Sequence, residues 1–206
     1  DADGLWEGHD IMEVASYDGW IKNKSLVLDF YNQRRRQLHE VQPNLGHITL
    51  AELENDFDVH IITQNVDNLH EQAGSSNVLH LHGELFKVRS DSHFSPEIFE
   101  WKTDLTENDK DSNGNQLRPH IVWFGEQVPM IEVAGSIAAK ADIFIVIGTS
   151  LVVYPAAGLV HYTDFTVPKY VIDPNKPTIS NMQNVEYITE KASVGVKQVV
   201  EKLMED

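Results

Sequence analysis

The first quarter of the chain carries apolar residues at the spacing of an amphipathic helix. A helix is predicted over 26–40, with Ser25 as its cap, and its apolar face is formed by Leu26, Phe30 and Leu38. A second helix is predicted over 44–56, directly after Pro43, because the fixed backbone angle of proline favours a helix start. The beginning of the chain is therefore expected to be helical.

From residue 59 onward, short apolar runs alternate with helical stretches. The runs that predict strands are 59–65, 77–83, 141–150, 169–175 and 185–190. Helices are expected in a short stretch after the first run, over 130–141, and over 192–205. This alternation predicts an α/β fold of the Rossmann-like, doubly wound type, in which helices cover both faces of a mostly parallel sheet.

One segment interrupts the alternation. Residues 87–119 are polar and rich in turn-forming residues, and they show no aliphatic periodicity. Such a segment predicts an exposed insertion that forms a smaller lobe beside the core.

Composition narrows the classes of protein that remain. The 206 residues, 41% of them hydrophobic, suffice for a globular protein with a sizeable core. The absence of cysteine excludes disulfides and thiolate zinc sites. A net charge of -16 opposes binding to phosphate backbones, so nucleic acid is not expected as a partner. No apolar run reaches about 18 residues, so no membrane span is expected, and the cytoplasm is the default location without a targeting pattern.

Polar clusters follow four of the predicted strands. They are Gln64-Asn65, His82-Gly83, Gly148-Thr149-Ser150 and Asp173-Pro174-Asn175. Each cluster alone could be ordinary turn chemistry, but the carboxyl ends of parallel strands meet at one sheet edge, so together they predict a ligand site. The pair His80 and His82 leaves two interpretations open: a metal-dependent hydrolase that also uses Asp67, or a single catalytic base beside a buried, hydrogen-bonded histidine.

Four longer blocks carry a family resemblance: TQNVDNLHEQAG, HLHGELFKVR, RPHIVWFGEQVP and GTSLVVYPAA. In order and spacing they resemble the signature blocks of the sirtuins, the NAD-dependent protein-lysine deacylases. The resemblance implies a dinucleotide-binding domain with a smaller lobe. Its expected boundaries are 1–50 for helices of the lobe and the start of the core, 51–86 and 120–206 for the two parts of the dinucleotide-binding domain, and 87–119 for the lobe insertion.

The resemblance also implies a reaction. In the family, the acyl oxygen of the substrate attacks the nicotinamide ribose of NAD, nicotinamide leaves, and a histidine activates a ribose hydroxyl, which yields O-acyl-ADP-ribose. His82 matches this general base, and a neutral imidazole suits the role. Asn65 and Asp67 are the other expected catalytic residues.

Cofactor and substrate residues carry over by position. The residues expected to bind NAD are Gln64, Asn65, Val66, Asp67, Gly148, Thr149, Ser150, Asn175 and Ala192. The residues expected to hold acyl-lysine and its peptide, which would add as a strand, are Val122, Phe124, Gly125 and Val152.

Tyr31 and Arg34 bear on the preferred acyl group. They lie three residues apart, so they share a helix face, and they resemble the Tyr-x-x-Arg pattern of sirtuins that remove succinyl or malonyl groups. A tyrosine hydroxyl and a guanidinium can hold a carboxylate together. Arg35 and Arg36 are expected to be solvated.

The chain departs from the family in two respects. Where the family has four zinc-binding cysteines, this chain has Ser90 and the segment 109–119, so no metal is expected, and Phe94, Ile98, Phe99 and Trp101 are candidates to pack the lobe. The family's opening strand and Gly-rich phosphate loop are not seen before DADGLW, so the 206-residue chain by itself is expected to bind NAD poorly. A non-catalytic NAD- or ADP-ribose-binding module is therefore the alternative function.

Overall fold

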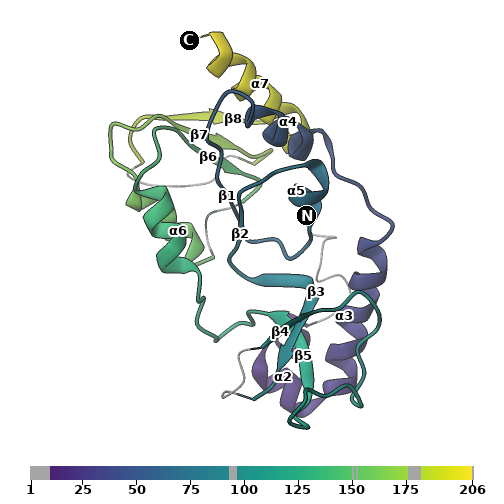
Figure 1. Cartoon of the computed structure of the whole chain (residues 1–206). Helices are drawn as coiled ribbons and strands as arrows, with labels where there is room; N and C mark the ends of the chain where they lie inside the picture. Colours follow the sequence, from purple (N-terminus) through teal and green to yellow (C-terminus); the bar gives the residue numbers. More distant parts are fainter. Residues whose placement is uncertain (1–9, 93–96, 150, 152, 176–181, 206) are drawn as a thin grey trace. The chain divides into compact units, whose positions relative to one another are not determined.

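The computed structural model describes residues 10–92, 97–149, 151, 153–175 and 182–205. The chain divides into two compact units, and Figure 1 follows it by colour from purple to yellow. Unit 1 comprises 1–41, 65–68 and 82–128, and unit 2 comprises 42–64, 69–81 and 129–206. The predicted insertion, 87–119, lies wholly within unit 1.

Unit 1 combines three helices with an antiparallel sheet. The helices are α1 (Ile11–Val14), α2 (Tyr17–Lys22) and α3 (Lys24–Leu38). The sheet has the order β4-β3-β5, with bounds Ile98–Glu100, Gly83–Ser90 and Leu117–Ile121 respectively. Helix α3 packs on β3 and β5, and the interior holds the large side chains of Trp20, Phe30, Tyr31, Leu105 and Trp123.

Unit 2 carries the parallel strands. The strands β1 (Ile61–Thr63) and β2 (Val78–His80) form one parallel pair, and β6 (Phe144–Ile147), β7 (Lys169–Ile172) and β8 (Val185–Ile188) form a parallel sheet in that order. The helices are α4 (Leu45–Leu53), α5 (Leu69–Ala73), α6 (Ile131–Ala138), the 3-10 helix η1 (Ala156–Tyr162) and α7 (Ala192–Glu205). Parallel strands alternating with helices confirm the predicted α/β class.

The core of unit 2 lies between α4, α7 and the parallel strands. Its buried members are Leu50, Ile61, Tyr170, Ile172, Val196 and Val199. At Gly195, a Cβ would come within 2.4 Å of Ile172 Cγ2, so this glycine lets α7 pack tightly on β7. Within the described parts of the chain, no helix combines the length and apolar character needed to cross a membrane.

Two helix starts differ from the prediction. Helix α3 begins at Lys24 because the side chain of Asn23, not Ser25, accepts the capping hydrogen bond from the Leu26 N–H. Helix α4 begins at Leu45, where Asn44 and His47 form a reciprocal capping box, so Pro43 precedes the cap. At both helix starts, the side-chain oxygen of an asparagine accepts the capping hydrogen bond, in place of the predicted Ser25 or Pro43.

The predicted packing of the lobe was wrong at two positions. Ile98 is 50% exposed and Phe99 is 36% exposed, because β4 is a three-residue edge strand that pairs only with β3. Trp101 is partly buried, and Phe94 falls outside the described residues. The interior around β3 is instead filled by Val88, Leu105 and Leu117.

Candidate active site

The first predicted polar cluster directly follows β1. Gln64 belongs to unit 2, whereas Asn65, Val66 and Asp67 belong to unit 1. The Val66 carbonyl accepts a hydrogen bond from the Leu85 N–H at 2.7 Å, which anchors this short segment to β3. Asn65 is exposed and the others are half-buried, so their polar side chains can meet a ligand.

His82 lies between β2 and β3, where the chain makes a close approach to β5. Gly83 has a φ of 83°, and a Cβ there would lie 1.9 Å from the His120 carbonyl oxygen, so only glycine fits. This approach lets the His82 carbonyl accept a hydrogen bond from the Val122 N–H at 2.9 Å. Unit 1 thus brings the predicted general base next to the predicted peptide-binding segment, 122–125.

The segment 122–125 is itself fixed at two further points. The Phe124 N–H donates to the Ala15 carbonyl at 2.9 Å, and Gly125 turns the chain with a φ of 87°. Phe124 is 45% exposed, so its side chain is open to a partner. Two predicted site residues, Ser150 and Val152, lie outside the described residues.

Unit 2 places the other predicted NAD-binding residues at the carboxyl ends of β6 and β7. The Gly148 N–H donates to the Ile172 carbonyl at 2.9 Å, so the two strand ends lie side by side, and beyond β7 the Asn175 N–H donates to the Asp173 carboxylate at 2.7 Å. Gly148 has a φ of 61°, and nothing lies within 4 Å of the position that a Cβ would take. Open space beside a backbone amide, next to the hydroxyl of Thr149, fits a phosphate or ribose group. Ala192 begins α7 and is half-buried.

The side chain of His80 is buried and hydrogen-bonded. Its Nε2 lies 2.7 Å from Glu71 Oε1, and its side chain is only 7% exposed. Burial acts to raise the pKa of the Glu71 carboxyl, but the hydrogen bond with His80, together with a backbone hydrogen bond and the charges of His80 and His70, outweighs that effect and the pKa is lowered. The pair links α5 to β2, which confirms the interpretation of His80 as a buried, hydrogen-bonded histidine.

The three consecutive arginines of α3 have three different environments. Arg34 is half-buried, its guanidinium lies 3.5 Å from the Phe30 ring centroid, and it donates to the Phe30 carbonyl. Arg36 is exposed and pairs with Asp104 at 2.7 Å. Arg35 was predicted to be solvated, but it is 1% exposed. It donates to Asn32 and to the Leu85 carbonyl, and burial lowers its pKa to about 10.

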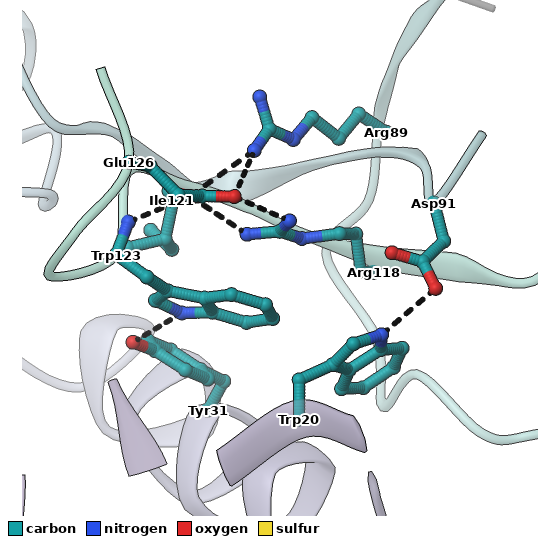
Figure 2. A network of polar contacts seen from close by, with 8 residues as sticks. All are labelled: Trp20, Tyr31, Arg89, Asp91, Arg118, Ile121, Trp123 and Glu126. Atoms are coloured by element: carbon teal, nitrogen blue, oxygen red, sulfur yellow. Dashed lines mark hydrogen bonds and ion pairs between the residues drawn. The ribbon is translucent and has the colours of Figure 1, made fainter. Parts of the chain in front are cut away.

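Tyr31 is also buried, at 1% exposure, and its hydroxyl accepts a hydrogen bond from Trp123 Nε1 at 3.0 Å. Figure 2 shows this contact as one end of a polar network that continues through Glu126 and Arg118. Burial is the main reason that the pKa of Tyr31 is raised well above its usual range, so the hydroxyl stays protonated.

Sequence reasoning missed this network. Its members Arg118, Trp123 and Glu126 all lie in the RPHIVWFGE block, yet Trp123 connects them to α3 through Tyr31, 92 positions earlier in the chain. The one local signal is alternation: if Val122 and Phe124 face a substrate, Trp123 faces the opposite side. His120, in the same block, was also overlooked, and burial followed by the charge of Arg89 lowers its pKa to about 4.

Hydrogen bonds connect the residues that stand where the family has its zinc-binding cysteines. Ser90 and Asp111 are buried, and the Ser90 oxygen accepts from the Ser92 N–H. The Asp111 carboxylate accepts from the Asn115 side chain and from the backbone N–H groups of Asn113 and Asn115. The Asn115 side chain, with further help from Ser90 and these amides, lowers the pKa of Asp111 to about 2. A carboxylate satisfied in this way stabilises the loop without a metal.

Comparison with known proteins gives consistent results. A model of the Sir2 family matches residues 1–155. An NAD-dependent protein deacylase of Helicobacter pylori (strain ATCC 700392 / 26695) is 54% identical over 205 residues, covering 100% of this chain and 89% of that protein. One from Bacteroides thetaiotaomicron is 48% identical over 209 residues, covering 99% of this chain and 89% of that protein.

Solved structures agree with these relatives. A Sir2 homologue in complex with ADP-ribose is similar with a TM-score of 0.90 and 34% identity, covering 98% of this chain and 83% of the other. A Sir2 homologue in complex with NAD is similar with a TM-score of 0.88 and 34% identity, covering 98% of this chain and 81% of the other. The sequence blocks, the fold and the relatives therefore point to the same family.

Proposed function

This chain belongs to the Sir2 family, and we propose that it removes succinyl, malonyl and acetyl groups from protein lysines. Its relatives are named NAD-dependent protein deacylases, and that activity, with NAD as cofactor, is the function of this family member. The choice among acyl groups is the finer part of the proposal. It is supported by the environment of Arg34 on α3.

Each unit by itself contains residues that are proposed to bind part of NAD. In unit 2, the open space beside Gly148 and the polar side chains of Thr149 and Asn175 would suit phosphate and ribose, and Ala192 would offer an apolar contact for adenine. The amides of Gln64 and Asn65 and the carboxylate of Asp67 suit the carboxamide and ribose of the nicotinamide half. When bound, NAD supplies an electrophilic ribose carbon to which the acyl oxygen adds as nicotinamide leaves.

His82 is proposed as the general base. Its backbone is held by the hydrogen bond to Val122, and the close approach at Gly83 fixes the direction in which the chain leaves it. An imidazole that is neutral near pH 7 can take a proton from a ribose hydroxyl at its ring nitrogen. The segment 122–125, tied to His82, is proposed to pair with the peptide backbone beside the acyl-lysine.

Arg34 is proposed to recognise the free carboxylate of succinyl- or malonyl-lysine. It is half-buried and stacked on Phe30, so the guanidinium is held in place and only partly hydrated. A guanidinium in such a setting forms stronger bonds to a carboxylate than one in full solvent. The stacking of Arg34 is the single observation that carries the proposed acyl preference.

Kinetics with matched peptides test the proposal. The full-length protein is incubated with succinyl-lysine and acetyl-lysine peptides of one sequence, with and without NAD. Arg34→Met is expected to lower kcat/KM for the succinyl peptide roughly 10- to 100-fold, the effect of losing a charge-assisted hydrogen bond, with little effect on the acetyl peptide. Arg36→Met is the matched control, because Arg36 pairs with Asp104 instead.

The outcomes separate the alternatives. Equal losses on the two peptides in Arg34→Met would contradict the carboxylate-binding role. Turnover without NAD, abolished by EDTA, would favour the metal hydrolase, and NAD binding without turnover would favour the non-catalytic module. The bacterial relatives support a cytoplasmic location, which stays a proposal together with the absence of nucleic-acid partners.

A further inference from the structure

Trp123 links Glu126 to Tyr31 in the network of Figure 2. It is 2% exposed, and its Nε1 donates to the Tyr31 hydroxyl at 3.0 Å. An indole nitrogen has a hydrogen and no free acceptor site, so the Tyr31 oxygen must be the acceptor in this bond. The phenolic proton of Tyr31 is then the part of the hydroxyl that remains to be donated to another group.

Trp123 is held on both its backbone and its ring. Glu126 accepts a hydrogen bond from the Trp123 backbone N–H at 2.8 Å and binds Arg118 through both carboxylate oxygens, at 2.7 and 3.0 Å. The Arg118 guanidinium lies 3.4 Å from the centroid of the Trp123 ring, and the Arg118 side chain is only 4% exposed. A buried ion pair contributes little net stability, so its use here points to control of geometry.

The same residue joins two parts of the proposed substrate site. Its neighbours in sequence, Val122 and Phe124, belong to the proposed peptide-binding segment, whereas its side chain contacts α3 at Tyr31. The Val122 N–H is bonded to His82, and the Phe124 N–H is bonded to Ala15, so the segment cannot shift without moving Trp123. Trp123 therefore sets the position of the Tyr31 hydroxyl relative to the bound peptide.

We propose that Trp123 is a positioning residue for acyl specificity: its indole N–H orients the Tyr31 hydroxyl so that the phenolic proton is donated to the carboxylate of a succinyl or malonyl group. This inference rests on the proposed recognition of that carboxylate by Tyr31 and Arg34. Because burial keeps Tyr31 protonated, the hydroxyl remains a neutral donor and does not repel an anionic acyl group. Arg118 and Glu126 act one step further away, through Trp123.

Removing the single N–H tests the inference. Trp123→Phe keeps an aromatic ring over Arg118 but loses the donor. It is expected to lower kcat/KM for a succinyl-lysine peptide roughly 3- to 10-fold, while kcat/KM for the acetyl-lysine peptide changes less than about twofold. Tyr31→Phe should have an equal or larger selective effect, and the double variant should lose no more than Tyr31→Phe alone, because Trp123 acts only through the Tyr31 hydroxyl.

A neighbouring tryptophan provides the matched control. The ring centroid of Trp20 lies 5.7 Å from that of Trp123 in the same cluster, but Trp20 donates to Asp91 instead of Tyr31. Trp20→Phe is expected to lower the melting temperature without changing the ratio of succinyl to acetyl activity. A change in that ratio equal to that of Trp123→Phe would show a general packing effect and overturn the inference.

Failure of this inference can be told apart from failure of the proposed function. Equal losses on both peptides in Trp123→Phe, with Arg34→Met still selective, overturn the role of Trp123 alone. The role of Trp123 is also overturned if Trp123→Phe lowers the ratio of succinyl to acetyl activity in a protein that already carries Tyr31→Phe. Absence of NAD-dependent desuccinylation in the unsubstituted protein overturns both proposals.

A second substitution covers the case in which Trp123→Phe does not fold. Placing 3-benzothienylalanine at position 123 replaces the N–H by sulfur and keeps the shape of the indole. A selective loss of succinyl activity with an unchanged melting temperature supports the positioning role, and an unchanged ratio of the two activities overturns it.

Discussion

Tyr31 and Arg34 share one face of α3, but their surroundings predict unequal contributions to binding the acyl carboxylate. Tyr31 is 1% exposed and already accepts a hydrogen bond, whereas Arg34 is half-buried and cationic. A carboxylate gains more from a guanidinium than from a neutral hydroxyl, so Arg34→Met should cost clearly more desuccinylation than Tyr31→Phe. Steady-state kinetics on one succinyl peptide measures this order. A larger loss in Tyr31→Phe would show that the hydroxyl is the main contact.

His120 predicts a pH dependence of stability. Its folded pKa of about 4 lies below the unfolded value of about 6.5, so between these pH values the unfolded chain binds a proton that the folded chain does not. The free energy of unfolding should therefore fall as the pH drops from about 6.5 to about 4. Urea titrations at a series of pH values measure it.

His120→Gln should flatten that part of the pH profile, because glutamine does not titrate. His161→Gln, which changes an exposed histidine, serves as the control and should leave the profile unchanged. If the dependence of the unfolding free energy on pH is unchanged in His120→Gln, a group other than His120 causes it.

Residue identity alone predicted some roles and not others. The roles of the block TQNVDNLH and of His82 stay predictions that rest on the family resemblance of these local blocks. The burial of Arg35 could not be predicted, because it depends on the Leu85 carbonyl, 50 positions away. The contact of Trp123 with Tyr31 spans 92 positions and had only a weak local signal in the alternation of the strand.

At the scale of elements, the junction of β3 with β5 is the tightest constraint near the site. Gly83→Ala should destabilise the protein by about 3 kcal/mol or more, because the new Cβ meets the His120 carbonyl and the residue keeps a positive φ. Gly114 has the same φ of 83° with nothing within 4 Å, so Gly114→Ala isolates the cost of the backbone conformation. Chemical denaturation of both variants gives the difference. Equal destabilisation would mean that β5 moves aside easily.

The elements themselves were largely predictable where their pattern is local. Periodicity predicted α3, α4, α6 and α7, and caps moved the starts of α3 and α4 by one or two residues. The antiparallel sheet of unit 1 was not predicted, because β3 pairs with β5 across a long polar segment and the register of that pairing shifts between Gly83 and Val88 of β3. Pairing of that kind depends on long-range contacts and leaves no periodic signature.

For the whole molecule, the chain divides into two units, and the predicted domain boundaries stay a prediction beside that division. The chain passes between the units at 41/42, 64/65, 68/69, 81/82 and 128/129. Three of these crossings fall beside Gln64, Asn68 and His82, in polar blocks that sequence reasoning assigned to function. A change in composition marks the insertion at 87–119. No such change marks the points where the chain passes between the units, so the sequence does not reveal them.

The molecule is also predicted to be independent of metal, because hydrogen bonds replace the cysteine cluster of the family. Ser90 and the Asn113–Asn115 turn satisfy the Asp111 carboxylate, so EDTA should change neither the melting temperature nor NAD-dependent deacylation. Asp111→Asn should lower the melting temperature at pH 7, because its amide NH2 would face N–H donors. Glu107→Gln, an exposed change in the same segment, should have no effect. Loss of stability or activity in EDTA, restored by zinc, would show that a metal binds after all.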